Sequence, residues 1–247
     1  MPLLQAVSPQ VDQAIDALRR GQFILLYDAD GREEETDLVI ASEHVTPDAV
    51  RRMRVDGGGL ICTTLHPRVH EALDLPYLSD VIAHAGRDNP LLARLANGAV
   101  PYEKGESKPS FTLSINHRET FTGVTDNDRS LTIRALAQTA AQAGRLPDDQ
   151  LRERFAAEFK SPGHVFLLNA KPGLVQARRG HTELSTALLE LAGTSPTATI
   201  CEMMNGPSGR ALPKSGAIKY AAQNGLAFLE GREVLDAWMR APIGGRT

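Results

Sequence analysis

Apolar residues along the chain follow two periods, one typical of helices and one typical of strands. Residues 8–21 carry Val11, Ile15 and Leu18 at helical spacing before a closing glycine. Residues 23–27, FILLY, form a short unbroken apolar run, which is typical of a strand covered on both faces. The chain is therefore predicted to open with an amphipathic helix and a buried strand.

The same two periods recur through the rest of the chain. Further strands are predicted at residues 38–43, 59–65, 111–116, 164–170, 197–204 and 226–230. Further helices are predicted at residues 46–57, 126–144, 181–193, 213–225 and 231–241. We expect helix N-caps at Ser8, at Thr46, and at Asp126 or Asp128. Residues 84–110 are the most irregular stretch, and its polar end, residues 101–110, is predicted to be a surface loop.

Strands interleaved with helices predict a layered α/β fold. Two of the strands, residues 23–27 and 38–43, follow each other with only a loop between them, so some pairing should be antiparallel. No Pro/Gly/Ser-rich linker divides the sequence. We predict a single domain over residues 1–247, of the mixed α/β (α+β) class, around a mixed parallel and antiparallel sheet.

Composition excludes several classes of protein. The 247 residues have a formal net charge of −3 and are 42% hydrophobic, without a basic stripe for nucleic acid or an apolar run long enough for a membrane span. The N-terminus does not have the charge order of a signal peptide. Cys62 and Cys201 show no CxxC spacing, so neither a disulfide framework nor a zinc site is indicated. We expect a cytoplasmic protein without nucleic-acid or membrane partners.

An acidic stretch follows the first predicted strand. Around the single Arg32 it places Asp28, Asp30, Glu33, Glu34, Glu35 and Asp37. Carboxylates gathered in this way repel one another unless a cation intervenes, and oxygen ligands favour hard ions such as Mg²⁺ or Mn²⁺. A solvated acidic loop is the alternative, because polar residues are common where strands end. The stretch is a candidate metal site.

A second cluster begins the helix predicted at residues 181–193. Arg178, Arg179 and Gly180 lead into His181 and Thr182, so guanidinium groups and backbone N–H groups would converge there. This arrangement suits a phosphate group. An ordinary capped helix start is the alternative interpretation. His181 also offers a nitrogen ligand to a metal held by the acidic stretch.

Three further residues are candidates at strand ends. His164 opens one predicted strand, Glu202 closes another, and Cys62 lies within a third. Each has a structural alternative, since a terminal His or Glu is often simply a satisfied polar group, and a free cysteine packs as a small hydrophobe.

Six motifs in register carry a resemblance to a known family: DGREEETD, GLIC, FTGVTDNDRS, PGHVF, RRGHTE and ICEMMN. Over about residues 10–240 the chain resembles 3,4-dihydroxy-2-butanone 4-phosphate synthase, the riboflavin biosynthesis enzyme that acts on D-ribulose 5-phosphate. The resemblance implies a three-layer fold around the mixed sheet and a homodimer with sites near the interface. We expect the monofunctional form, because the sequence has no room for a fused GTP cyclohydrolase II domain.

The resemblance also implies roles for individual residues. Glu33 and His181 would hold Mg²⁺ or Mn²⁺, as one or two ions per site. The implied catalytic residues are Asp28, Arg32, Glu33, Glu35, Cys62, His164 and Glu202. The implied substrate-binding residues are Arg32, Asp37, Arg178, Arg179, Gly180, His181, Thr182 and Glu202. The chain departs from the usual family pattern at Gly31, Thr36, Ser161 and Leu167 without losing any of these residues.

In the implied reaction a base removes the C3 proton of ribulose 5-phosphate, water leaves from C1, the skeleton rearranges, and C4 departs as formate. Another Mg²⁺-dependent phosphosugar enzyme, such as an isomerase or aldolase, would use similar residues but would release no formate. A non-catalytic nucleotide-binding or RNA-associated module would need a basic, aromatic-rich surface, which the sequence lacks.

Overall fold

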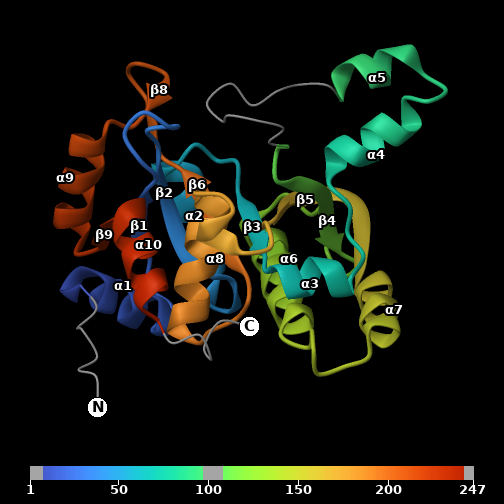
Figure 1. Cartoon of the computed structure of the whole chain (residues 1–247), viewed down its shortest axis with the longest axis horizontal. Coiled ribbons are helices and arrows are strands. Elements are labelled where there is room, and N and C mark those ends of the chain that lie inside the picture. The colour runs from blue at the N-terminus through green and yellow to red at the C-terminus, as the bar shows by residue number, and fades with distance from the viewer. Residues whose placement is uncertain (1–7, 97–107, 242–247) are drawn as a thin grey trace.

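A seven-stranded sheet forms the centre of the computed structural model, which describes residues 8–96 and 108–241. In the order in which they pair, the strands are β4 (Phe111–His117), β5 (Phe159–Asn169), β3 (Cys62–Leu65), β6 (Ala198–Glu202), β2 (Thr36–Ala41), β1 (Ile24–Tyr27) and β9 (Ala227–Glu230). A separate small hairpin pairs β7 (Met204–Asn205) with β8 (Arg210–Ala211). Strands from both ends of the sequence therefore meet in one sheet (Figure 1).

The sheet is mixed. β1 pairs antiparallel with β2 and parallel with β9, and β3 pairs parallel with β5 and antiparallel with β6. The predicted antiparallel neighbours at the start of the chain, and with them the mixed sheet, are confirmed.

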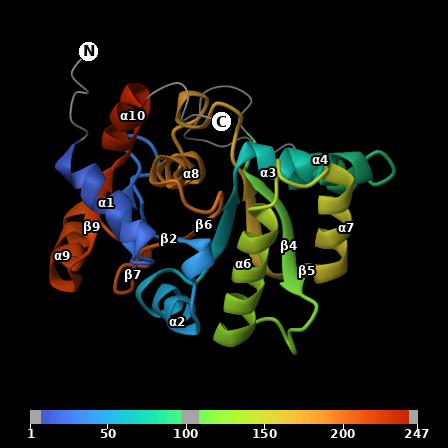
Figure 2. The same ribbon diagram turned by 90° about the horizontal axis from the view of Figure 1, so that it is seen from below.

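Helices cover both faces of this sheet. They are α1 (Pro9–Arg19), α2 (Pro47–Asp56), α3 (Pro67–Ala72), α4 (Leu78–Ala85), α5 (Pro90–Leu95), α6 (Asp126–Ala140), α7 (Asp148–Glu158), α8 (His181–Ala192), α9 (Lys214–Asn224) and α10 (Gly231–Arg240). Two short 3₁₀ helices, η1 (Ser42–His44) and η2 (Leu174–Gln176), complete the elements. Helices α1, α8 and α10 pack on one face, while α2 and α6 lie on the other (Figure 2).

Alternate residues of β1 show why this run is apolar throughout. Ile24 and Leu26 belong to the core beneath α1, α8 and α10, whereas Leu25 belongs to the core on the opposite face. All four β1 residues are buried, because successive side chains of a strand point to opposite faces. The predicted two-face burial and three-layer arrangement are confirmed.

Helix ends agree with the sequence at some positions and not at others. The Thr46 side chain accepts a hydrogen bond from the Ala49 N–H, as an N-cap should, and a left-handed Gly193 ends α8. Ser8 occupies an N-cap position but makes no capping bond with its side chain. The prediction of Asp126 or Asp128 as the cap of α6 is wrong, because Thr125 holds that position and accepts from the Asp128 N–H.

The stretch predicted to be irregular contains helical structure. α5 lies entirely within residues 84–110, α4 ends there, and both lie far from α9 in Figure 1. The prediction of a surface loop at residues 101–110 is wrong for Ser110, which is buried. Residues 101–107 lie outside the described part of the chain. No helix in the described ranges is both long and apolar enough to span a membrane.

One end of the sheet collects the chemically active residues. The β1–β2 connection spans residues 28–35, and Asp37 at the start of β2 pairs in register with Glu202 at the end of β6. Cys62 at the start of β3 pairs with Ile200, which precedes Glu202 on the same strand. Because β2, β6 and β3 pair antiparallel, these three distant segments of the chain meet at the same end of the sheet.

Candidate active site

Asp28 organises the acidic loop. Its carboxylate accepts hydrogen bonds from the backbone N–H groups of Glu33 and Glu35, at 3.0 and 3.1 Å, and from Arg32 Nη1 at 3.1 Å. The Asp28 side chain is fully buried, so these three donors compensate its charge. The acidic run is therefore folded around one of its own carboxylates, which places the other acids at defined positions.

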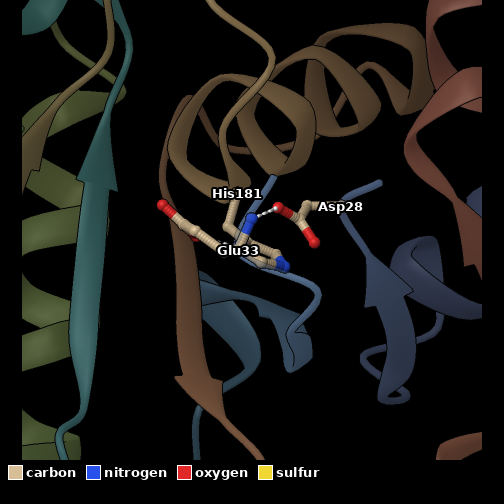
Figure 3. Close-up of side chains that lie close together, drawn as sticks. All are labelled: Asp28, Glu33 and His181. Atoms are coloured by element: carbon tan, nitrogen blue, oxygen red, sulfur yellow. Dashed lines mark hydrogen bonds and ion pairs between the residues drawn. The ribbon is translucent and has the colours of Figure 1, made fainter. Parts of the chain in front are cut away.

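Glu33, in the loop between β1 and β2, lies next to His181, the first residue of α8 (Figure 3). Glu33 Oε2 lies 3.2 Å from His181 Nδ1, while His181 Nε2 lies 3.2 Å from the carbonyl oxygen of Glu35. A carbonyl only accepts, so Nε2 carries a hydrogen, and Nδ1 is turned toward Glu33. Metal-binding histidines are oriented by the same kind of backbone contact.

The separation of these atoms suits a metal ion. Adjacent ligands of an octahedral ion with bonds of about 2.1 Å lie roughly 3 Å apart, close to the observed 3.2 Å. Ligand atoms of Asp28, Glu33 and His181 all lie within 4.8 Å of one another.

Asp37 supplies independent support for a cation site. It is 1% exposed, and neither carboxylate oxygen has a hydrogen-bond partner among the residues the structure describes. It lies 3.6 Å from His181 Nε2, as an ion pair without hydrogen-bond geometry. A buried carboxylate without hydrogen bonds is costly, which is expected where a ligand completes the site. The donor set thus fits Mg²⁺ or Mn²⁺.

Burial and mutual repulsion shift the protonation of this cluster. Burial raises the pKa of Asp37 well above its ordinary value, and Glu202 adds to the effect. Burial, together with Glu33 and Glu202, also raises the pKa of Glu35. For His181, burial alone would lower the pKa, but Asp37 and Glu33 outweigh it and raise the pKa to about 10. In the metal-free cluster His181 therefore holds a proton at neutral pH, which a bound cation would displace.

A cavity of about 160 Å³ adjoins these groups. Its polar lining residues are Glu33, Asp37, Ser110, Arg178, His181, Thr182 and Glu202. Its remaining lining residues are Cys62, Pro109, Phe111, Leu168 and Ile200. Typical pockets for drug-sized ligands measure roughly 300–1,000 Å³, so this cavity suits a small polar molecule.

Cationic groups lie beside the start of α8. Arg178 lines the cavity, and its Nη1 lies 2.9 Å from Glu183 Oε2. A methyl group at Gly180 would lie 2.2 Å from Arg178 Nη1 and 2.9 Å from Arg32 Nη2. Two guanidinium groups therefore meet at the glycine that precedes the helix, where helix N–H groups also favour an anion.

A larger cavity of about 510 Å³ lies beside α2. Its charged residues pair locally, with Arg51 next to Asp48 at 3.4 Å and Arg52 next to Asp56 at 3.7 Å. Because these charges compensate one another, we assign the chemistry to the smaller cavity, where the buried Asp37 carboxylate has no hydrogen-bond partner among the described residues.

The profile of the 3,4-dihydroxy-2-butanone 4-phosphate synthase family matches residues 12–237. The chain belongs to this family. It is 44% identical to the synthase of Methanothermobacter thermautotrophicus over 93% of this chain and 96% of that protein. It is 42% identical to the synthase of Archaeoglobus fulgidus over 93% of this chain and 94% of that protein. This coverage agrees with the expected monofunctional form.

A solved structure of a 3,4-dihydroxy-2-butanone 4-phosphate synthase in complex with two magnesium ions has the same fold. It is 30% identical to this chain and has a TM-score of 0.70, and the match covers 96% of this chain and 99% of that chain. Family membership confirms the resemblance seen in the sequence and makes the chain an enzyme of riboflavin biosynthesis, a lyase.

Seven of the residues expected from the synthase family line the cavity, namely Glu33, Asp37, Cys62, Arg178, His181, Thr182 and Glu202. Asp28, Arg32, Glu35 and Gly180 lie beside these residues without lining the cavity. His164 and Arg179 are different. His164 is exposed and bonds to Asn116 through its backbone N–H, and Arg179 is exposed next to Arg178. Neither is among the residues that line the cavity. Sequence reasoning missed Ser110, which ends a polar stretch, and Glu183, which looks like an ordinary acid in the first turn of a helix.

Proposed function

We propose that the chain converts D-ribulose 5-phosphate to L-3,4-dihydroxy-2-butanone 4-phosphate and formate. The observation that carries this proposal is one cavity that combines the Glu33–His181 pair and the buried Asp37, whose carboxylate oxygens have no hydrogen-bond partner among the described residues, with Arg178 at the start of α8. Glu33, His181 and Asp37 suit a metal and sugar oxygens, and Arg178 suits a phosphate. Family membership supports the same reaction.

Glu33 and His181 would hold the metal, and the neighbour solved with two magnesium ions supports Mg²⁺ as its identity. One or two ions, and Mn²⁺ as a substitute, fit this set of ligands. When bound, the metal supplies Lewis-acid stabilisation for vicinal sugar oxygens as they become anionic.

The side chains of the chain itself would handle protons and orient the substrate. Burial raises the pKa values of Asp37 and Glu35 above those of ordinary carboxyl groups, which suits groups that take up and release protons. Glu202 lies next to Asp37 in the sheet register, so it would reach the same carbon atoms. Asp37 would contact the sugar hydroxyls, while Arg178 and Thr182 would hold the phosphate at the other side of the cavity.

The remaining roles are proposed from the family resemblance. Asp28 and Arg32 would act in catalysis, although their contacts here order the loop; Cys62 would lie near the substrate. His164 would act as an acid/base group and Arg179 as a substrate ligand. We also propose a homodimer with sites near its interface, a cytoplasmic location, and a single domain over residues 1–247. Sedimentation equilibrium would test the dimer.

Incubation with D-ribulose 5-phosphate and Mg²⁺, followed by NMR, tests the proposed reaction. The spectrum should show formate and the four-carbon phosphate in equal amounts. Formation of a five-carbon isomer without formate would identify an isomerase instead.

A further inference from the structure

Arg178 is held in place by residues that do not belong to the metal cluster. Its Nη1 donates to Glu183 Oε2 at 2.9 Å and lies 3.4 Å from Ser110 Oγ. Only 10% of the Arg178 side chain is exposed, although its guanidinium group borders the cavity. The cationic group is therefore fixed against one wall of the cavity.

Glu183 is itself fixed from a second direction. Its other oxygen, Oε1, accepts the backbone N–H of Lys171 at 3.1 Å, and its side chain is fully buried. Lys171 closely follows β5, whereas Glu183 lies in the first turn of α8. The carboxylate thus ties the end of the sheet, the helix and the guanidinium group into one arrangement.

A carboxylate is needed for this double contact. Both Glu183 oxygens accept, one from a backbone N–H and one from Arg178. A glutamine of the same size has one accepting oxygen, and its NH₂ group would face a second donor. The substitution Glu183→Gln would therefore release either the backbone or the guanidinium group without changing the volume of the core.

Besides Glu183 and Ser110, the backbone at Gly180 also restricts the guanidinium group of Arg178. A Cβ atom there would lie only 2.2 Å from Arg178 Nη1, so the group is packed directly against the backbone before α8. Arginine binds phosphate best when its planar fork is already oriented, because less side-chain freedom is then lost on binding.

We propose that Glu183 is a positioning residue, which orients Arg178 so that it can bind the phosphate group of the substrate. This inference rests on the proposed function, because it takes the ligand to be a phosphosugar. Glu183 does not contact the substrate; it acts through Arg178. Ser110 assists by holding the same Nη1 atom.

The test compares Glu183→Gln with Glu190→Gln, a matched change in the same helix. Glu190 pairs with His66 at 2.9 Å, and neither residue lines the active-site cavity. The affinity for inorganic phosphate is measured by calorimetry on the Mg²⁺-loaded protein. KM and kcat are then measured separately for ribulose 5-phosphate and for unphosphorylated ribulose.

Glu183→Gln should weaken phosphate binding and raise KM for ribulose 5-phosphate by about tenfold or more, as expected for a charge-assisted contact. Its kcat should change little, and the kcat/KM for ribulose should match wild type. Glu190→Gln should leave phosphate affinity unchanged. In an Arg178→Gln background, Glu183→Gln should have no further effect on phosphate affinity, because the group it positions is gone.

The proposal would be overturned if Glu183→Gln and Glu190→Gln lost the same phosphate affinity. It would also be overturned if Glu183→Gln lowered phosphate affinity as much in the Arg178→Gln background as in the wild type. Should Glu183→Gln fail to fold, Ser110→Ala offers the same test. Because the Ser110–Arg178 contact is weaker, Ser110→Ala should lower phosphate affinity only about twofold or threefold. This loss should disappear in the Arg178→Gln background, and an equal loss there would overturn the inference. Arg178-dependent phosphate binding without formate production would refute the proposed function and leave the positioning role standing.

Discussion

A single methyl group at Gly180 should disturb substrate binding more than folding. Gly180 has φ −87° and ψ 165°, an extended conformation that any residue adopts, so Gly180→Ala introduces no backbone strain. The added Cβ would lie 2.2 Å from Arg178 Nη1, where an ordinary contact begins at 3.4 Å. The guanidinium group must therefore move by about 1.2 Å, the difference between these distances.

A movement of that size is large enough to break the 2.9 Å bond to Glu183 and to misalign Arg178 with a bound phosphate. The loss of one charge-assisted hydrogen bond costs about 1.5–3 kcal/mol, which corresponds to an increase in KM of about 10- to 150-fold. Steady-state kinetics with ribulose 5-phosphate would measure it. Circular dichroism should show a folded protein.

Gly206→Ala is the matched control, since a Cβ at this exposed glycine meets nothing within 4 Å. It should leave KM unchanged. A Gly180→Ala enzyme whose KM stays within about twofold of wild type would refute the view that Gly180 fixes the position of the guanidinium group.

Three further predictions concern the metal cluster and the neighbouring Cys62. Glu33→Gln should lose Mg²⁺ binding in calorimetry and lose turnover while remaining folded, and EDTA should inactivate the wild type reversibly; full activity of either sample would contradict the metal assignment. His181 has a folded pKa of about 10 against an ordinary 6.5, so the stability it gives the metal-free protein should be present below pH 6.5 and lost as pH rises toward 10. Denaturant unfolding in EDTA should show this fall, and His181→Asn should flatten it; an unaltered slope would count against the ion pairs. Burial, with Glu202 and Asp37, holds the pKa of Cys62 well above its ordinary value, so Cys62→Ala should keep most of its turnover, and an inactive folded variant would reveal a chemical role.

The sequence predicted elements best where side chains enter the core. β1 and the helices at both ends of the chain have buried faces, and their apolar periods identify them. α4 and α5 have no buried residues, and α7 buries only Leu151, so their sequences carry little of the periodic signal that reports a core contact. The hydrophobic pattern does not reveal these helices for that reason.

The candidate site was predictable in its chemistry but not in its supporting contacts. The residue types and spacing of the acids after β1 and of the His181 segment already indicate a metal and a phosphate. The anchoring role of Asp28 depends on backbone N–H groups that curl around it, and the role of Glu183 depends on Lys171 arriving from the end of β5. Such contacts arise from tertiary packing between distant segments, which the local sequence pattern does not report.

Isotope tracing from substrate to formate tests the central claim most directly. Ribulose 5-phosphate labelled with ¹³C at C4 should be incubated with the Mg²⁺-loaded enzyme, and the same reaction should be run with Glu33→Gln as a control. The account predicts that the wild type releases one labelled formate for each four-carbon phosphate formed, and that the variant releases none. Label that stays in a five-carbon sugar phosphate, or labelled formate released equally by the variant, would contradict it.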